Sequence, residues 1–232
     1  MEYAIFPLGD SALLIEAGKV IADSSQQAVR NIDALIESDA PAWLIETIPA
    51  FTTLTLIYNP LLITFNEAKE EVIELLKGAA DVSVPPPRTV EIPVCYGGTY
   101  GPDLEFVAQH NGLSTEQVIQ IHTRESYSVH MIGFAPGFPY LGGMSEKIAA
   151  PRKETPRVSI PARSVGIAGN QTGIYPISTP GGWQLIGRTP VRLFLPENDI
   201  PSLLRAGDKI AFRQISEDEY QALEEKENAN HT

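Results

Sequence analysis

Two stretches of the sequence gather side chains that could take part in chemistry. The first reads HMIGFAPGFPYLGGM over residues 130–144, and it sets His130 at the end of a strand-like run, beside a loop of glycine, proline and aromatic residues. A histidine that a strand delivers next to such a loop can exchange a proton near neutral pH. Taken singly, however, His130 fits a hydrogen-bonded structural histidine better than a catalytic one.

The second stretch, residues 157–190, combines cationic, polar and glycine residues. Its three arginines suit a carboxylate or a phosphate, because guanidinium presents a fixed fork of donors. Gln171 and Tyr175 could orient a small polar molecule, and the two glycines before Trp183 permit close backbone approach. Segment 147–196 as a whole carries seven basic side chains against one acid. From charge alone, an anion site and ordinary surface pairing with the acidic remainder of the chain are equally compatible with this segment.

The bulk composition excludes several classes of protein. A formal net charge of −12 over 232 residues argues against a nucleic-acid or acidic-membrane binder. No apolar run approaches the length of a membrane helix, and a single cysteine suits a reducing compartment, so a cytoplasmic location is expected. There is no P-loop, GxSxG elbow, HExxH or paired-cysteine motif, and His110, His122 and His130 are spaced too irregularly for a metal site. No metal site is therefore predicted.

Glycine and proline divide the chain into two parts. Fifteen of the nineteen prolines and fourteen of the eighteen glycines lie between Pro85 and Pro201. The stiff segment SVPPPR at 83–88 is the natural linker between the parts. We therefore predict a small α+β domain at 1–84, a β-rich domain at 85–215, and a C-terminal helix with a tail at 216–232.

The first part alternates strand and helix patterns, which favours helices on one face of an antiparallel sheet. One helix is predicted at 24–38 with Ser24 as its cap, and a second between Asn66 as cap and Gly78 as stop. The predicted strands cover residues 3–8, 11–17, 42–50 and 52–59.

The second part begins with a strand at 89–96 and two short helices. Asp103 is predicted to cap the first helix, and capping boxes are predicted for the second helix and for the final one. The rest reads as short strands broken by glycine and proline, which is typical of a β-barrel or a sandwich. The predicted boxes pair Ser114 with Gln117 and Ser216 with Glu219, and the later strands include 157–162, 164–169, 191–196 and 208–213.

Together the two chemically interesting stretches resemble the family of 5-oxoprolinase B subunits, also called the KipI or allophanate hydrolase subunit 1 family. The segments FPLGDSALLIE at 6–16 and EIPVCYGGTYGPDLEFVAQHNGLS at 91–114 extend the resemblance over nearly the whole chain. The resemblance implies an α+β fold class, with a small α+β N-terminal domain followed by a cyclophilin-like β-barrel C-terminal domain.

The same resemblance implies an enzyme that works as a complex. This chain would be the B subunit of an ATP-dependent 5-oxoprolinase, a hydrolase that opens 5-oxo-L-proline to L-glutamate in the cytoplasm. Its partners would be the C subunit, of the allophanate hydrolase subunit 2 type, and the A subunit, of the LamB/YcsF type. ATP would be used by the complex, and the sequence does not say which of its chains binds the nucleotide.

The expected site residues follow from chemical type together with family position. His130 is expected to transfer a proton or orient substrate, while Gln171 and Tyr175 orient the lactam. Arginines are expected to hold a carboxylate or phosphate, and backbone amides around two glycines to face an oxyanion. The expected substrate-binding residues are Arg157, Arg163, Arg188, Phe134, Tyr140, Gly181 and Gly182.

One branch of the family implies a different role. KipI-like members inhibit the autophosphorylation of a sensor histidine kinase in sporulation control, so an exposed apolar loop could instead contact a kinase. Fold alone cannot choose between part of an enzyme and a kinase inhibitor. Related domains form part of urea carboxylase, but the chain has no MKM biotin-attachment motif. Prolyl isomerase activity has only the barrel resemblance as its support.

Overall fold

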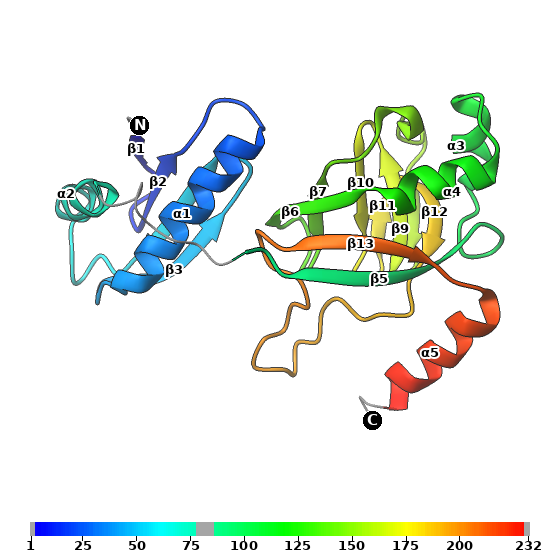
Figure 1. Ribbon diagram of the computed structural model, residues 1–232. Helices are drawn as coiled ribbons and strands as arrows, with labels where there is room; N and C mark the ends of the chain where they lie inside the picture. Colours follow the sequence, from blue (N-terminus) through cyan, green and yellow to red (C-terminus); the bar gives the residue numbers. More distant parts are fainter. Residues whose placement is uncertain (1–2, 78–85, 230–232) are drawn as a thin grey trace. The chain divides into compact units, whose positions relative to one another are not determined.

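The computed structural model describes residues 3–77 and 86–229 (Figure 1). The chain divides into two compact units, Met1–Pro86 and Pro87–Thr232. The predicted helix stop at Gly78 and residues 83–85 of the predicted linker lie outside the described residues.

The first unit is an antiparallel sheet with helices packed on one face. Its elements are β1 (Ala4–Pro7), β2 (Ala12–Glu16), α1 (Asp23–Asp39), β3 (Leu44–Pro49), β4 (Thr53–Tyr58) and α2 (Phe65–Leu76), and the strand order is β1-β2-β4-β3. Alternate residues of the central strands, such as Leu13 and Leu54, point to the helices and meet Ile32 and Val72 in one buried cluster. The period-2 strand pattern and the helical pattern therefore meet in a single core.

The starts of both helices differ from the prediction. Thr64, in extended conformation, caps α2: its hydroxyl accepts from the Glu67 amide, and the Glu67 carboxylate accepts from the Thr64 amide. Asn66 therefore lies inside the first turn, and its predicted role as cap is wrong. The cap position of α1 is Ala22, with no side-chain hydrogen bond, so the predicted cap at Ser24 is also wrong.

The second unit is a closed barrel of seven strands in the order β10-β7-β6-β13-β5-β12-β9. The strands β5 and β13 are parallel, whereas the other neighbours in the barrel are antiparallel. The bounds of the barrel strands are β5 (Thr89–Tyr96), β6 (Ser126–Ile132), β7 (Pro139–Gly142), β9 (Ser164–Ala168), β10 (Gln171–Ile174), β12 (Gln184–Arg188) and β13 (Lys209–Gln214).

Further elements accompany the barrel. Helices α3 (Leu104–His110) and α4 (Thr115–Arg124) lie between β5 and β6 in the chain (Figure 1). Helix α4 contacts β13 and the short helix η1 (Glu146–Ile148). Strands β8 (Arg157–Ile160) and β11 (Thr179–Gly181) form a separate two-stranded ribbon, and α5 (Glu217–Ala229) follows β13. The predicted fold class, a small α+β domain followed by a β-barrel, is confirmed.

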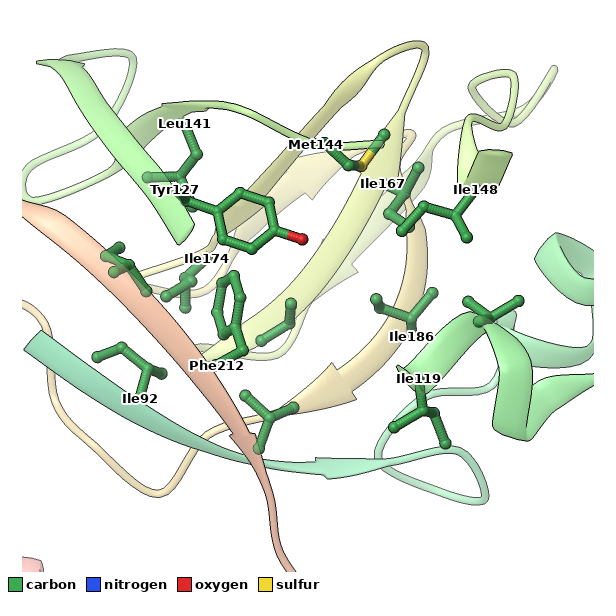
Figure 2. Close-up of a cluster of buried hydrophobic side chains, with 14 of the residues drawn as sticks. Ile92, Ile119, Tyr127, Leu141, Met144, Ile148, Ile167, Ile174, Ile186 and Phe212 are labelled. Carbon is green, nitrogen blue, oxygen red and sulfur yellow. The ribbon is translucent and has the colours of Figure 1, made fainter. Parts of the chain in front are cut away.

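The barrel interior is filled by apolar side chains from strands that are far apart in the sequence. Figure 2 shows Tyr127, Leu141, Ile167, Ile186 and Phe212 pointing toward one another there, and all of them are buried. Neighbouring residues of a strand point to opposite faces, so the residues directly before and after these inward-pointing ones lie on the outer face of the barrel.

One polar chain crosses this interior. His122 of α4 is fully buried, with Nδ1 2.8 Å from the Tyr96 hydroxyl and Nε2 3.0 Å from Oγ1 of Thr172. The Thr172 hydroxyl donates its proton to the carbonyl of Gly166, at 3.0 Å, so it must accept from Nε2. The neutral Nε2–H tautomer of His122 therefore links α4 to β5, β10 and β9. Burial lowers the pKa of His122 to about 3.

Three other predictions for this unit have different outcomes. The capping box of Ser114 and Gln117 on α4 is confirmed. On α5 the Ser216 hydroxyl accepts from the Glu219 amide as predicted, but the Glu219 carboxylate pairs with Arg213 at 3.0 Å. The predicted strand at 191–196 is wrong, since only an isolated bridge between Phe194 and Ser202 forms there. Prolines flank that segment, and proline cannot donate to a strand ladder.

Candidate functional site

On part of the outer face of the barrel, glycines leave the strand backbone without side chains. Gly166 of β9 and Gly173 of β10 alternate with residues that face the interior, so they point outward. A methyl group on Gly173 would lie 3.1 Å from both Phe138 and Trp183, and one on Gly166 would lie 3.2 Å from Trp183. The two aromatic rings therefore lie directly on the barrel backbone, where larger residues would push them away.

Five aromatic side chains meet on this glycine-covered face, and we call them the aromatic cluster: Phe134, Phe138, Tyr140, Tyr175 and Trp183. Phe138 is at the centre, with ring centroids 5.2 to 5.7 Å from those of the other four, all in edge-to-face geometry. Such pairs contribute about 0.5–1.5 kcal/mol each beyond their buried area. The predicted residues Phe134, Tyr140 and Tyr175 are thus brought together.

Phe134 is the exposed member of the aromatic cluster. It lies in the loop between β6 and β7, which is closed by a hydrogen bond from the Gly133 amide to the Phe138 carbonyl at 3.1 Å. Its side chain is 66% exposed, and its φ of 68° is unusual for a residue other than glycine. An exposed aromatic ring on a strained backbone is more common at functional sites than on inert surface.

His130 occupies a β-bulge between β6 and β7. Val129 pairs with Leu141 and Met131 with Tyr140, which leaves His130 as the extra residue. Its Nε2 would be 1.8 Å from a methyl group on Gly142, so the imidazole fills the space that a side chain at Gly142 would need. His130 is only 8% exposed. This geometry favours the orienting role over direct proton transfer among the roles predicted for it.

Gln171 and Tyr175 lie on the same outer face as His130. Gln171, Gly173 and Tyr175 alternate along β10 and its extension, and therefore point the same way. Thr172 pairs with Leu141 of β7, so the antiparallel register sets Gln171 opposite Gly142, the residue against which His130 packs. The three predicted catalytic residues are therefore carried by β6 and by β10 with its extension, the two strands that flank β7.

Tyr175 is almost fully buried, with only 2% of its surface exposed. Burial raises the pKa of its phenol to about 12, although Arg152, the backbone of Trp183 and Arg157 act in the opposite direction. A methyl group on Gly181 would lie 2.7 Å from the Tyr175 hydroxyl, so Gly181 leaves room for the phenol. Tyr175 is neutral at pH 7, and its hydroxyl can act as a hydrogen-bond donor.

The next glycine, Gly182, has a role in the backbone. Its carbonyl accepts a hydrogen bond from the Lys153 amide at 2.7 Å. This bond holds the irregular segment around Lys153 against the residues just before β12. The predicted oxyanion role of the backbone at Gly181 and Gly182 stays a prediction.

Arg157 is held by a buried carboxylate. Its guanidinium donates to Oδ1 of Asp103 at 2.8 Å, Lys153 approaches the same oxygen at 3.3 Å, and the Leu185 amide donates to Oδ2 at 2.7 Å. Burial alone would raise the pKa of Asp103, but the bonds from Arg157 and Leu185 and the charges of Arg157 and Lys153 bring it below its ordinary value. Asp103 occupies the cap position of α3 without capping it, because its oxygens are used here, so its predicted capping role is wrong.

Replacing Asp103 with alanine is expected to destabilise the chain by about 3 kcal/mol, because the substitution removes one partner of a buried ion pair. It leaves the Arg157 guanidinium and the Leu185 amide without their acceptor. Urea denaturation followed by tryptophan fluorescence measures this change, and Glu105→Ala, an exposed position on α3, is the matched control. A loss of stability below about 1 kcal/mol, the size of an exposed ion pair, would show that the contacts of Asp103 do not stabilise the fold as a buried ion pair does.

The other two predicted arginines lie apart from Arg157. Arg163 donates to the Pro190 carbonyl at 2.9 Å and to Glu224 of α5 at 2.5 Å. Arg188 donates to the Ala162 carbonyl at 3.0 Å. Burial raises the pKa of Tyr220 of α5 to about 12, and the positive charges of Arg163 and Arg188 act in the opposite direction. Arg163 therefore pairs with the acidic C-terminal helix, and the structure does not gather the three arginines around one anion.

Two kinds of functional feature are absent from the part of the chain that the structure describes. No group of three or more His, Cys, Asp or Glu side chains there is placed to hold a metal ion. None of the described helices has the length and apolar character needed to cross a membrane.

The fold agrees with a known class of domain. The family model for the carboxyltransferase domain, subdomain C and D, matches residues 3–204. The structure of Kluyveromyces lactis urea carboxylase superposes with a TM-score of 0.74 at 17% identity, over 97% of this chain and 23% of that one, which shows the shared fold. The chain is thus a carboxyltransferase-type barrel with its N-terminal α+β unit.

Similar proteins narrow the family further. The chain is 52% identical to the B subunit of 5-oxoprolinase from Bacillus subtilis, over 98% of this chain and 99% of the relative. It is 42% identical to the corresponding 5-oxoprolinase B subunit of Escherichia coli O157:H7, over 88% of this chain and 93% of the relative. The chain belongs to the family of 5-oxoprolinase B subunits.

Proposed function

We propose that this chain is the B subunit of a cytoplasmic, ATP-dependent 5-oxoprolinase that converts 5-oxo-L-proline to L-glutamate. The observation that carries the proposal is the identity of 52% to a protein of that name across 98% and 99% of the two chains. Its partners are the C subunit, of the allophanate hydrolase subunit 2 type, and the A subunit, of the LamB/YcsF type. The designation of the relatives as subunits supports an assembly of several chains.

The proposed reaction has two parts, activation of the lactam by ATP and hydrolysis of the activated ring, and this supports the use of several subunits. ATP transfers its terminal phosphoryl group to the lactam oxygen, leaving ADP. A first water adds to the activated ring carbon, and the C–N bond opens to release the amine and leave an acyl phosphate. A second water then attacks the acyl carbon, and the phosphate leaves with the former lactam oxygen to give the carboxylate of glutamate. The sequence has no P-loop, so we infer that ATP use depends on the complex.

The site on the outer face supplies the groups that hold such a substrate. Phe134 and Tyr140, the members of the aromatic cluster that are not buried, offer apolar ring surface for a flat lactam. Gln171 can hydrogen-bond the lactam amide, and the neutral hydroxyl of Tyr175 can donate to its oxygen. His130, fixed by the bulge and by Gly142, keeps the neighbouring strand residues in place.

Reconstitution tests this proposal directly. The chain alone is expected to form no glutamate, whereas the chain mixed with the A and C subunits is expected to release glutamate and phosphate from 5-oxoproline only when ATP is present. His130→Ala in the assembled complex should lower turnover, whereas the control Arg124→Gln, which changes an exposed arginine of α4, should match wild type. A complete complex without ATP-dependent glutamate release would refute the proposal.

The kinase-inhibitor function is the second candidate, and exposed apolar residues of the barrel unit favour it. Phe134 is 66% exposed and Val158 is 89% exposed, which suits contact with a protein partner. In this case the chain alone should inhibit autophosphorylation of a sensor histidine kinase at about one chain per kinase monomer, with no need for 5-oxoproline. The kinase assay is therefore run beside the reconstitution with the same preparation.

A further inference from the structure

Four of the five arginines in segment 147–196 are engaged inside the protein. Arg152 is the exception: it is exposed, and within the described ranges 3–77 and 86–229 no hydrogen bond or ion pair engages its guanidinium. The other four have polar partners: Arg157 donates to Asp103, Arg163 to Glu224, Arg188 to the Ala162 carbonyl, and Arg192 to Asn228.

The backbone on both sides of Arg152 is fixed against the start of β12. The Pro151 carbonyl accepts from the Gln184 side-chain amide at 2.9 Å, and the Lys153 amide donates to the Gly182 carbonyl at 2.7 Å. These two bonds set Arg152 alongside the segment that carries Trp183. An arginine on such a fixed backbone loses less freedom when it binds an anion than one on a loose loop.

Two further cations, Lys153 and Arg157, follow Arg152 in the chain, and the exposed Glu154 is the one acid of segment 147–196. Lys153 and Arg157 share the single buried carboxylate of Asp103, which can balance only one of their two charges. The charge of Arg152 acts on the phenol of Tyr175, which places the guanidinium within electrostatic range of the aromatic cluster. Phe138, Tyr175 and Trp183 are buried, so Phe134 provides the exposed ring of the aromatic cluster for a ligand whose anionic group Arg152 binds.

We propose that Arg152 binds the carboxylate of the substrate, while the ring of the substrate lies against the exposed side of the aromatic cluster. The inference rests on the proposed function and assigns the anion-binding role to an arginine that the family resemblance and the charge count did not single out. The ligand class is a small carboxylic acid with a flat amide ring. The guanidinium fork matches the two oxygens of such a carboxylate.

The test compares Arg152→Gln and Arg152→Lys with wild type and with Arg124→Gln in the assembled complex. Arg152→Gln is expected to raise the KM for 5-oxoproline at least about 10-fold, because a charge-assisted bond is lost. Arg152→Lys should recover part of that loss, and Arg124→Gln should match wild type. An unchanged KM in Arg152→Gln, with wild-type turnover intact, overturns the inference and leaves the proposed function standing.

A binding measurement separates the two proposals if turnover fails. Ligand-observed NMR on the assembled complexes measures the affinity for 5-oxoproline and for its neutral carboxamide. Arg152→Gln should weaken binding of the carboxylate at least about 10-fold and change that of the carboxamide less than about 2-fold, since only the former contacts the guanidinium. Equal weakening of both ligands, or no binding of 5-oxoproline to wild type, overturns the inference. A wild-type complex that binds 5-oxoproline but never opens it refutes the proposed function instead.

Discussion

Replacing Gly142 with alanine is expected to lower turnover of the assembled complex by about 100-fold, the size of effect that a displacement of roughly 1 Å near a reacting group can have. The new methyl group would lie 1.8 Å from Nε2 of His130, so the imidazole must leave its place. That ring sits in the bulge near the end of β6, and the loop of Phe134 follows that strand. The substitution therefore disturbs His130 and the aromatic cluster without removing any functional side chain.

Stability measurements test the same contact independently of activity. Gly142→Ala in the isolated chain should cost about 1–3 kcal/mol, which is usual for an overpacked site. His130→Ala removes the ring, so adding Gly142→Ala to that variant should cost much less, and the double-mutant cycle should show strong coupling. If the two changes were additive in urea denaturation, His130 and Gly142 would not share the space that the structure gives them.

Acidification is expected to weaken the fold through His122. Its pKa is lowered to about 3 in the folded chain, against an ordinary value of 6.5, so between these values the unfolded state binds the extra proton. The associated stability is complete above pH 6.5 and is lost as the pH falls toward 3. The full loss is about 5 kcal/mol, at 1.36 kcal/mol for each pH unit, and about 2 kcal/mol of it is lost by pH 5.

Urea denaturation from pH 7.5 to pH 4.5 measures this dependence. His122→Gln removes the titrating group and should flatten the pH profile, although it lowers stability at pH 7.5 by breaking the bonds to Tyr96 and Thr172. His110→Gln, at an exposed position of α3, should keep the wild-type profile. Identical profiles for wild type and His122→Gln would show that His122 does not couple folding to protons.

Local patterns in the sequence predict much of the fold. Alternating apolar residues place β4, and short apolar runs place β2 and β13. The box of Ser114 and Gln117 marks the start of α4 because both partners lie within one turn. The helix starts at Ser24 and Asn66 are predicted wrongly, since several polar residues compete there and backbone conformation decides which one caps. The sequence left barrel and sandwich open, because strand pairing depends on contacts between distant segments.

The sequence predicts part of the candidate site, because some of its contacts follow from local strand positions and others depend on distant segments. Phe134, Tyr140, Tyr175 and Gln171 share one face, which their strand positions allow. The use of the arginines was not predictable, because their acceptors, such as Asp103 and Glu224, lie more than fifty residues away. The single glycine inside each of the strands SVGIA and QTGIY was the signal for the glycine-covered face, since glycine inside a strand often marks close packing against the backbone.

The position of β5 in the barrel has a consequence for synthesis of the chain. Its two neighbours, β12 and β13, begin at Gln184 and Lys209, whereas β5 ends at Tyr96. During synthesis on the ribosome, both edges of β5 can therefore be paired only after nearly all of the remaining sequence has been made. Such long separations slow folding, and an uncovered apolar edge invites aggregation. Nascent chains halted shortly before Lys209 should accordingly depend on chaperones, while the first unit can already be complete.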